Sequence, residues 1–512
     1  GHTCYPKERL ITRSAQMLGT DEDNVKQVYN KLVLDGTLCE NLYNNYPAVA
    51  FSSAYNAESY SAYRLIELSR ATPKTLPIAS VVRDVLENAG LSEMQETAVN
   101  TALNENLCII TGGPGTGKTT ILNELISILE RSGIKTVLAA PTGRAAKRME
   151  KSTGRTALTI HRLLEYGQNP EEDDFSGCKF QRNKENPIEA EAVIIDESSM
   201  IDAFLLKSLL NAVEPGTRLV FTGDCDQLPS VGPGNVLKDM IKSGYISVCR
   251  LKEVFRQKGN IAFNAHLINE GKMPDLFSAG DFIFIPAVSA EDTLDKVLKL
   301  YGDEIKNGVK ADELQVICPL KRGKIGVYEI NAQIRDRENP MLFGKNEIKY
   351  GETLFREGDK IMQTRNNYSK EWFIKGRLKQ LSKGTGVFNG DMGVINSIDP
   401  EDGALELVFD DERVCEYDKN ELDQIEHAYA VTVHKSQGSE FETVIIPLFY
   451  GKSPFLSRNL IYTAVTRAKK KLIIIGVKSA LEHMVKNNSI AHRFTALDYE
   501  MKKYAELFSK NE

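Results

Sequence analysis

The chain has 512 residues, 42% of them hydrophobic, and a formal net charge of −6. This length and composition predict an ordinary folded protein of three or four domains with several hydrophobic cores. A slightly acidic balance does not exclude a nucleic-acid partner, because a binding groove needs only a local basic lining.

Cysteine usage and hydropathy narrow the class of protein. The eight cysteines are scattered without a C-x-x-C pair, which argues against a zinc site or a disulfide framework and predicts reduced thiols in the cytoplasm. The chain has no run of eighteen apolar residues and no secretory signal at its start, so no membrane contact is expected. It opens Gly1-His2-Thr3 without a methionine, which is typical of a truncated protein, and we expect upstream sequence to be missing.

Residues 1–80 are predicted to form a small helical module. Apolar residues recur at helical spacing over Ile11 to Leu18, Val25 to Leu34 and Ala57 to Ser69, and Ala48 to Ser52 fits a short strand. This order resembles a winged-helix piece. Such modules either bind DNA or serve as inert packing domains, and the sequence leaves both roles open.

Residues 81–260 are predicted to form a first parallel-sheet domain, because strand-like apolar runs alternate with helical stretches. The polar segment 166–189 breaks this rhythm and is predicted to be an inserted β-hairpin that protrudes from the sheet. The expected strands are Leu107–Ile110, Lys135–Ala139, Ala192–Ile195 and Arg218–Phe221.

A second α/β domain is predicted from 261–351 together with 426–512, with strands at Leu314–Pro319, Val444–Pro447 and Lys471–Ile475. Between these parts, residues 352–425 change to short β runs separated by Gly, Asn and Asp, which predicts a small inserted β-barrel. Its expected strands are Asp359–Gln363, Val387–Ile398, Ala404–Phe409 and Arg413–Tyr417. The predicted fold class is therefore α/β, with two parallel sheets, a hairpin, a barrel and a helical module.

Residues 371–385 carry extra length within the predicted barrel. The segment holds the only tryptophan, Trp372, together with Lys375, Arg377, Lys379 and Lys383. A basic, aromatic loop of this kind can contact DNA. A flexible surface loop without a ligand is the other interpretation.

The segment from Gly112 to Thr120 fits the phosphate-loop pattern G-x-x-x-x-G-K-[ST] without a mismatch. An apolar strand precedes it and a helix follows, so glycine N–H groups and the helix N-terminus can face phosphate oxygens. Lys118 can reach the β- and γ-phosphates, and the Thr119 hydroxyl can bind Mg²⁺. The residues expected to hold ATP are Gly113, Pro114, Gly115, Thr116, Gly117, Lys118, Thr119 and Thr120.

Two further polar segments follow apolar strands. Asp196 and Glu197 come after Val193–Ile195, where Asp196 can hold Mg²⁺ and Glu197 can polarise an attacking water. Gln227 follows the strand that ends near Phe221, and its neutral side chain can bond both a γ-phosphate and that water. Together with the phosphate loop, these residues predict a nucleoside triphosphatase.

The string G-D-x-x-Q-L-P-S-V-G-x-G-N-V-L-x-D-M from Gly223 to Met240 resembles superfamily 1B helicases of the RecD type, and among them the stand-alone RecD2 group. The resemblance covers about residues 85–480. It implies two RecA-like motor domains, 1A and 2A, a hairpin 1B and an SH3-like barrel 2B. The segments that carry it further are Leu91–Gln95, Ala140–Ala146, Thr159–Leu164, Phe255–Gln257, Tyr429–Phe441 and Tyr462–Ala468, similar to the Q motif and motifs Ia, Ib, IV, V and VI.

The resemblance implies roles for residues of these segments. Arg256 and Arg467 would be arginine fingers on the γ-phosphate, Gln95 would read adenine, and Glu440 would lie near the ribose or γ-phosphate. Ser92-x-x-Gln95 also satisfies a helix capping box, which remains an alternative for Gln95. The residues that would contact single-stranded DNA are Pro141, Thr142, Arg144, His161, Thr432, His434 and Lys435.

His161 and His434 could instead be packing histidines. The predicted function is an ATP-dependent DNA helicase that moves 5′ to 3′, with the polarity implied by the resemblance alone. It would use ATP and Mg²⁺, bind single-stranded DNA and its junction with duplex, act as a monomer and serve repair or recombination. Alternatives are a translocase with little unwinding, an ATP-gated DNA-binding scaffold and a small-molecule kinase.

Overall fold

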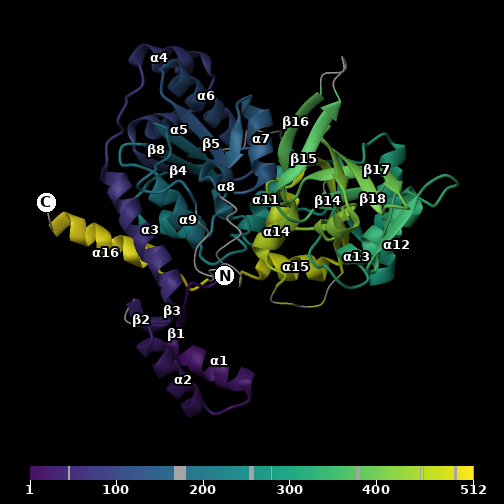
Figure 1. Ribbon diagram of the computed structural model, residues 1–512, viewed down its shortest axis with the longest axis horizontal. Coiled ribbons are helices and arrows are strands. Elements are labelled where there is room, and N and C mark those ends of the chain that lie inside the picture. The colour runs from purple at the N-terminus through teal and green to yellow at the C-terminus, as the bar shows by residue number, and fades with distance from the viewer. Residues whose placement is uncertain are drawn as a thin grey trace. The chain divides into compact units, whose positions relative to one another are not determined.

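The computed structural model forms two compact units (Figure 1). Unit 1 comprises Gly1–Pro141, Met149–Arg256 and Ala491–Glu512, and unit 2 comprises Thr142–Arg148 and Gln257–Ile490. The structure describes residues 1–43, 46–166, 180–252, 259–277, 280–375, 381–449, 451, 453, 455–488 and 493–510.

The N-terminal part of unit 1 contains the helices that apolar spacing predicts. α1 ends at Gly19, which adopts the left-handed conformation, and Asp21 caps α2 by accepting a hydrogen bond from the Asn24 N–H at 2.8 Å. The three strands form an antiparallel sheet in the order β1-β3-β2. The elements are β1 (Cys4–Pro6), α1 (Lys7–Leu18), α2 (Glu22–Leu34), β2 (Leu38–Tyr43), β3 (Tyr46–Phe51) and α3 (Ser52–Arg70).

A six-stranded parallel sheet in the order β6-β5-β7-β8-β4-β9 is the centre of unit 1. Its four predicted strands are confirmed within two residues at each end, whereas β6 and β9 were not predicted. The strands are β4 (Leu107–Gly112), β5 (Thr136–Ala140), β6 (Ala157–Thr159), β7 (Ala192–Ile195), β8 (Arg218–Gly223) and β9 (Ser247–Leu251).

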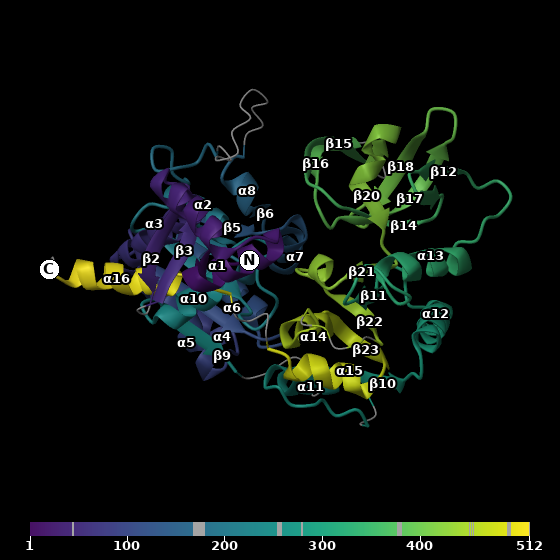
Figure 2. The ribbon, with the colours of Figure 1, turned by 90° about the horizontal axis from the view of Figure 1, so that it is seen from below.

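Helices cover both faces of this sheet, which explains why its strands are continuous apolar runs. Leu107 and Ile109 face a core shared with α3, α9, α10 and α16, and α5 and α6 pack on the sheet as well. α16 also packs directly against α3 and α10 (Figure 2). The helices of unit 1 are α4 (Ala79–Asn88), α5 (Glu93–Asn104), α6 (Lys118–Arg131), α8 (Ile160–Leu163), η1 (Ser198–Met200), α9 (Ala203–Ala212), α10 (Val236–Ser243) and α16 (Leu497–Lys510). α7 (Gly143–Thr153) begins in unit 2 and ends in unit 1.

The segment predicted as a protruding hairpin is described only at its base. Tyr166 and Phe180 form an antiparallel bridge, and the Arg182 N–H donates to the Leu164 carbonyl at 3.2 Å. Residues 181–189 contain no strand. The predicted tip, 167–179, lies outside the described residues.

A five-stranded parallel sheet in the order β10-β23-β22-β11-β21 is the centre of unit 2. The three predicted strands are confirmed. α12 and α13 cover one side, and α11, α14 and α15 lie on the other (Figure 2). The elements are α11 (Asn260–Asn269), β10 (Phe282–Pro286), α12 (Ala290–Lys306), β11 (Leu314–Cys318), α13 (Val327–Glu338), β21 (Ala430–Thr432), η3 (His434–Ser436), β22 (Phe441–Leu448), α14 (Arg458–Val465), β23 (Ala468–Gly476) and α15 (Lys478–Lys486).

A seven-stranded antiparallel sheet in the order β16-β15-β19-β18-β17-β14-β20 forms the rest of unit 2. Alternate residues of its strands, such as Leu405 and Leu407, fill a single apolar cluster. β12 and β13 form a separate two-stranded sheet. The elements are β12 (Glu347–Tyr350), β13 (Thr353–Arg356), β14 (Lys360–Gln363), β15 (Asn367–Lys375), β16 (Leu381–Val387), β17 (Met392–Asp399), β18 (Ala404–Phe409), β19 (Val414–Tyr417), η2 (Lys419–Gln424) and β20 (Ile425–His427).

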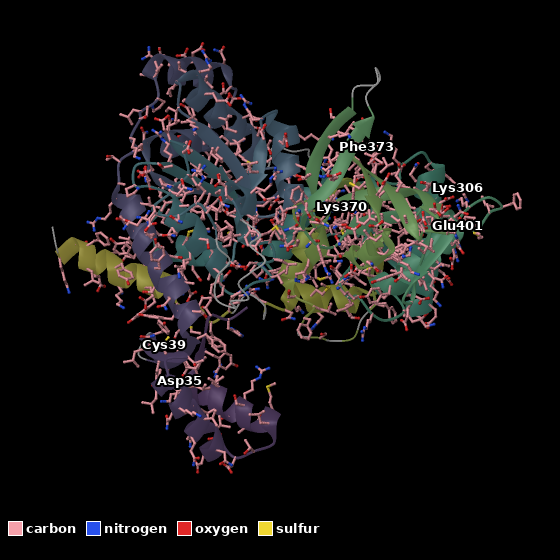
Figure 3. The ribbon with its side chains drawn as sticks, in the orientation of Figure 1. Asp35, Cys39, Lys306, Lys370, Phe373 and Glu401 are labelled. Atoms are coloured by element: carbon pink, nitrogen blue, oxygen red, sulfur yellow. The ribbon has the colours of Figure 1, made fainter. Side chains whose placement is uncertain are left out.

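Two expectations about this sheet are wrong. The run Val387–Ile398 is not one strand, because residues 388–391 turn at Gly390, whose φ is 95°, and Asp391 accepts from the Phe388 N–H at 3.1 Å. Residues 371–375 and 381–385 are not a loop either: they belong to the paired strands β15 and β16. Lys370 and Phe373 mark this part of the sheet in Figure 3. The expectation that this segment carries extra length stays a prediction.

Among the residues that the structure describes, no helix combines the length and the apolar composition that crossing a bilayer requires.

Candidate active site

The candidate site lies at the carboxyl ends of three neighbouring strands of unit 1. β7, β8 and β4 are adjacent in the sheet, and they lead into Asp196, Gln227 and the phosphate loop respectively. Parallel strands bring their carboxyl ends to one edge, where α/β proteins bind ligands. The tertiary structure therefore gathers the three segments that the sequence singled out.

The phosphate loop adopts the conformation that its glycines permit. Gly115 and Gly117 have φ values of 76° and 83°, in the left-handed region that a side chain disfavours. Gly117 is also the N-cap of α6, and no side chain caps that helix. The N–H groups of the first turn can therefore bind an anion, which fits a nucleotide phosphate.

Lys118 folds over this loop. Its Nζ donates to the carbonyl oxygens of Gly112 at 2.5 Å and Gly113 at 2.9 Å, and the Thr116 hydroxyl donates to Gly113 as well. The lysine is thus held above the loop by weak neutral acceptors. A phosphate, which bears a full negative charge, can replace them.

Gln95 combines two contacts. The capping box is present: Ser92 N–H donates to Gln95 Oε1 at 3.1 Å, and Gln95 N–H donates to Ser92 Oγ at 3.4 Å. At the same time Gln95 Nε2 donates to the Thr116 carbonyl at 3.3 Å. The capping interpretation is confirmed, and the same side chain is bonded to the phosphate loop. Its predicted contact with adenine stays a prediction.

The two carboxylates after β7 differ in their surroundings. Asp196 Oδ1 accepts a 2.5 Å hydrogen bond from the Thr222 hydroxyl on β8. Glu197 is 7% exposed and has a φ of 52°, which is uncommon for a residue with a side chain. Asp196 with Thr119 of the phosphate loop offers oxygen ligands that suit Mg²⁺.

Gln227 is 6% exposed and donates from Nε2 to Asp224 Oδ2 at 3.2 Å. The other oxygen of Asp224 accepts from the Asp226 N–H at 3.0 Å, and the Cys225 N–H donates to Thr111 Oγ1 on β4 at 3.4 Å. These bonds attach the segment after β8 to the strand that leads into the phosphate loop.

Arg467 and Glu440 belong to unit 2. Arg467 is 2% exposed, and its guanidinium donates to Thr463 O at 3.1 Å, Ser439 O at 3.0 Å and Thr466 Oγ1 at 3.1 Å. Glu440 lies 3.2 Å from Arg148 and 3.8 Å from Lys469. Arg467 therefore has a structural role in unit 2, where it joins α14 to the segment that precedes β22. Its role as an arginine finger stays a prediction.

Two of the predicted DNA contacts are threonines that cap a turn. Thr142 Oγ1 accepts from the Ala145 N–H and Thr432 Oγ1 from the Lys435 N–H, both at 3.3 Å. Thr159, in the predicted motif Ib, does the same for the Arg162 N–H at 3.2 Å. A hydroxyl that accepts in this way can donate its own hydrogen to a phosphate oxygen.

The charged and aromatic residues of the DNA set have varied surroundings. Arg144 lies 5.6 Å from the Phe441 ring centre, and burial lowers its pKa. Lys435 pairs with Glu426 at 2.7 Å, and His434 is exposed. Pro141, the last residue of the first segment of unit 1, is half-buried.

His161 packs in an aromatic cluster at the base of the hairpin segment. Its ring centre lies 6.1 Å from that of Tyr166 and 5.8 Å from that of Phe180. Burial lowers the pKa of His161 and outweighs the opposing effect of Asp202, which favours the neutral ring. His161 thus has the ring contacts that the packing interpretation expects, and its contact with DNA stays a prediction.

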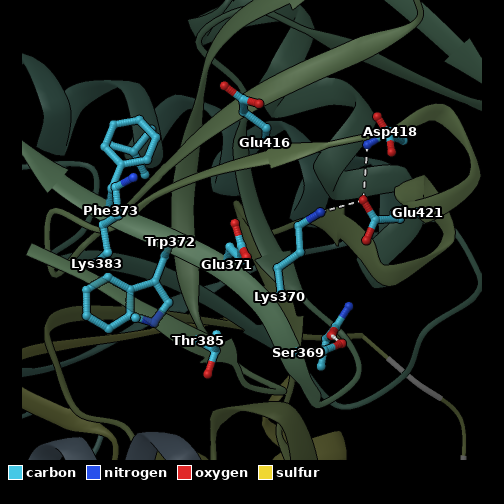
Figure 4. A pocket seen from close by; sticks show the side chains of 13 residues that line it. Ser369, Lys370, Glu371, Trp372, Phe373, Lys383, Thr385, Glu416, Asp418 and Glu421 are labelled. Atoms are coloured by element: carbon cyan, nitrogen blue, oxygen red, sulfur yellow. Dashed lines mark hydrogen bonds and ion pairs between the residues drawn. The ribbon is translucent and has the colours of Figure 1, made fainter.

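A cavity of about 820 Å³ lies on the antiparallel sheet of unit 2, over the segment predicted as a basic loop (Figure 4). Trp372 and Phe373 line it, but carboxylates outnumber lysines in its wall, and Lys370 is paired with Glu421. A net acidic wall disfavours a nucleic-acid backbone. The lining residues are Asn367, Ser369, Lys370, Glu371, Trp372, Phe373, Lys383, Gly384, Thr385, Val414, Glu416, Asp418 and Glu421.

Arg256 lies outside the described residues. Sequence reasoning also missed partners of the site: Thr222, which bonds Asp196, and Asp224, which bonds Gln227. Both are polar residues at the end of the same predicted strand, and that signal could have identified them. Nothing in the sequence indicated that Arg148 pairs with Glu440, because only the tertiary structure brings them together.

Three sequence families match separate parts of the chain. They are an AAA domain over residues 95–233, the SH3 domain of ATP-dependent RecD-like DNA helicases over residues 330–409, and a UvrD-like helicase C-terminal domain over residues 427–475.

Two curated relatives extend these matches. The chain is 34% identical over 394 residues to the ATP-dependent RecD2 DNA helicase of Deinococcus radiodurans, covering 76% of this chain and 50% of that one. It is 30% identical over 446 residues to the RecBCD enzyme subunit RecD of Mycolicibacterium smegmatis, covering 79% of this chain and 74% of that one. The chain thus matches half the length of the Deinococcus relative.

Among solved structures, the Pif1 helicase from Bacteroides in complex with ADP-AlF3 and single-stranded DNA is similar over 77% of this chain and 94% of that one. The sequence identity is 20% and the TM-score is 0.46.

Proposed function

We propose that this protein, which belongs to the RecD-like family of superfamily 1 DNA helicases, couples ATP hydrolysis to movement along single-stranded DNA and unwinds duplex. We assign it a 5′ to 3′ polarity and a role in repair or recombination, from its similarity to RecD-type enzymes. We expect it to act as a monomer on a junction of single-stranded and duplex DNA. The similarity to named helicases suggests the activity, and the residues of the candidate site supply the chemical argument for it.

The single observation that carries the proposal is the convergence of three segments at one edge of the unit 1 sheet. The phosphate loop, Asp196 and Gln227 follow β4, β7 and β8, which are neighbours. Hydrolysis of a nucleoside triphosphate needs a phosphate cradle, a metal ligand and a group that orients water. A small-molecule kinase would not need Gln227 in this place.

Each residue has a task in this proposal. Lys118 and the first turn of α6 bind the β- and γ-phosphates, Glu197 takes a proton from the attacking water, and Gln227 orients that water. Mg²⁺, held by Thr119 and Asp196, would neutralise charge on the phosphate oxygens. Arg467 would stabilise charge that develops on the γ-phosphate.

The test is the rate of ATP hydrolysis with and without single-stranded DNA, followed by unwinding of duplexes with either a 5′ or a 3′ tail. We expect strong stimulation by DNA and unwinding from the 5′ tail alone. Unwinding from the 3′ tail would contradict the polarity. Stimulation without unwinding would support a translocase instead.

Two variants test whether ATP hydrolysis takes place at this site. Lys118→Ala should lower kcat for ATP by more than about a hundredfold, because the charge on the β- and γ-phosphates loses its partner. Glu197→Gln should bind ATP and DNA together without turnover, because an amide cannot accept the proton. Normal turnover in either variant would contradict the assignment.

A further inference from the structure

Arg493, which precedes α16, binds the loop that follows Gln227. Its guanidinium donates to three backbone carbonyls: Ser230 at 2.6 Å, Gly232 at 2.9 Å and Gly234 at 2.7 Å. A longer contact of 3.4 Å reaches the Ser230 hydroxyl. Arg493 and the loop both belong to unit 1.

Within the loop the Ser230 hydroxyl donates to the Gly232 carbonyl at 3.2 Å, and Arg493 donates to that carbonyl and to two more. Residues 224–235 join β8 to α10 without helix or strand, and Gly234 has a φ of 106°. Three of its carbonyl oxygens converge on one point, and a backbone N–H can serve only one or two of them. Buried carbonyls without a donor cost free energy. The planar fork of an arginine offers several N–H groups at once, which a lysine cannot match.

Only two residues separate Ser230 from Gln227. Leu228 is 1% exposed and Ser230 is 4% exposed, so both are fixed by packing, and the ring of Pro229 fixes its own φ. A constraint on the Ser230 carbonyl therefore restricts the backbone that carries Gln227. At the other end of this backbone the Gln227 N–H donates to the Asp224 carbonyl at 3.4 Å, and the Gln227 side chain donates from Nε2 to Asp224 Oδ2 at 3.2 Å.

We infer that Arg493 is a positioning residue for ATP hydrolysis: it fixes the loop 228–234 and thereby holds Gln227 in place. The inference rests on the proposed function of Gln227, and it adds to the hydrolysis site a positioning residue that is distant in sequence. Arg493 touches neither nucleotide nor DNA in this scheme. It acts through Gln227 alone.

The charge of Arg493 is partly compensated. Burial lowers its pKa, and Asp239 on α10 opposes that effect. A guanidinium stays charged under these conditions, because its ordinary pKa is far above neutrality. The hydrogen bonds from Arg493 to the loop are therefore charge-assisted and stronger than bonds between neutral groups.

The docking of α16 does not depend on Arg493. The Phe494 carbonyl accepts from the Thr3 N–H at 3.0 Å, and the Ala496 N–H donates to Glu58 Oε2 at 3.0 Å. Leu497 and Met501 are 2% and 0% exposed in the core of unit 1. The variant Arg493→Ala should therefore fold with α16 in place.

The experiment compares DNA-stimulated ATP hydrolysis of four proteins: the unaltered chain, Arg493→Ala, Gln227→Ala and the double variant. For Arg493→Ala we expect kcat to fall about tenfold and KM for ATP to change less than about twofold, because a disordered loop misplaces the water but not the phosphates. In the Gln227→Ala background, the added substitution Arg493→Ala should lower kcat by less than about a further twofold. Arg493→Lys should give an intermediate kcat, since one ammonium replaces only part of the fork.

Arg155→Ala is the matched control. Arg155 pairs with Glu130 at 2.9 Å on the surface of unit 1 and is distant in sequence from the loop. Its kcat should equal that of the unaltered chain. An unchanged kcat in both Arg493 variants would contradict this inference but not the proposed function. The same holds if the reductions in kcat of the two single variants multiply in the double variant. Absence of ATP hydrolysis by the unaltered chain would overturn the proposed function and this inference with it.

Discussion

Gln95 donates a hydrogen bond from Nε2 to the carbonyl oxygen of Thr116 at 3.3 Å, while its Oε1 accepts from the Ser92 N–H. One side chain therefore caps α5 and binds the phosphate loop. This explains how a capping signature and a nucleotide-site signature can occupy the same residue. The two contacts use both the acceptor and the donor of the amide, whereas a carboxylate offers acceptors only.

Gln95→Glu should raise KM for ATP about tenfold, because the carboxylate keeps the cap but repels the Thr116 carbonyl instead of bonding it. Initial rates of hydrolysis over a range of ATP concentrations measure this effect. Ser92→Ala is the control: it should lower the free energy of unfolding by about 1 kcal/mol and leave KM unchanged. Equal KM values in Gln95→Glu and the unaltered chain would contradict a role for Gln95 in shaping the loop.

Thr222→Val should raise the Mg²⁺ concentration needed for half-maximal ATP hydrolysis about tenfold, because Asp196 loses the hydroxyl that orients it. A magnesium titration at saturating ATP checks this. Thr222→Ser retains the hydroxyl and should behave like the unaltered chain. An unchanged magnesium requirement in Thr222→Val would count against Asp196 as a metal ligand.

Arg467→Ala should lower kcat about a thousandfold if the residue is an arginine finger. It should also lower the free energy of unfolding by about 2 kcal/mol, because the carbonyls of Ser439 and Thr463 lose their donor. Urea denaturation together with hydrolysis rates separates the two effects.

Arg458→Ala provides the comparison for Arg467. Arg458 begins the same helix, α14, and donates to the Val485 carbonyl at 2.8 Å. It should lose stability without losing kcat at a permissive temperature. A similar loss of kcat in both variants would mean that Arg467 acts through the structure of unit 2 only.

The stability of unit 1 should fall as the pH rises from about 5 to about 8. The pKa of Glu58 is raised from 4.5 to about 8, chiefly by burial and to a smaller extent by Asp239 and Asp498, against the hydrogen bonds from Thr3 and Ala496. The folded protein therefore holds a proton that the unfolded chain releases, and the resulting stabilisation is complete below pH 4.5 and lost as the pH approaches 8. Asp239, whose pKa burial raises to about 7, acts in the same direction.

Glu58→Gln should flatten this dependence, because an amide does not titrate but can still accept from the Ala496 N–H. Urea denaturation between pH 5 and pH 9 measures the slope. Glu87→Gln, at an exposed position of α4, should leave the slope as it is. The same slope in Glu58→Gln and the unaltered chain would show that another group is responsible.

The sequence predicted the regular parts of the fold because their patterns are local. Leu107–Ile110 and Ala192–Ile195 are apolar throughout, as strands buried on both faces must be, and both are strands of the unit 1 sheet. Residues 371–375 and 381–385 were harder to predict as strands, because their mixture of polar, glycine and aromatic residues has no strong period. Pairing of β15 with β16 overrides that weak local preference.

The candidate site was predictable in its residues but not in its bonds. Lys118, Asp196 and Gln227 each follow an apolar strand, and that spacing indicated their position at one sheet edge. Their hydrogen-bond partners depend on strand order, which local patterns do not encode. β8 lies between β7 and β4, and this order places Thr222 beside Asp196.

The sequence by itself determined the phosphate loop, the class of fold and the family, since each depends on the identity and spacing of nearby residues. Only the tertiary structure decided that Gln95 binds the Thr116 carbonyl, that Arg467 joins the segments around Ser439 and Thr463, and that Arg493 binds the loop beyond Gln227. These contacts join residues between 4 and more than 250 positions apart. Such pairs meet because chain packing brings buried donors and acceptors together, and each must find a partner wherever the fold supplies one.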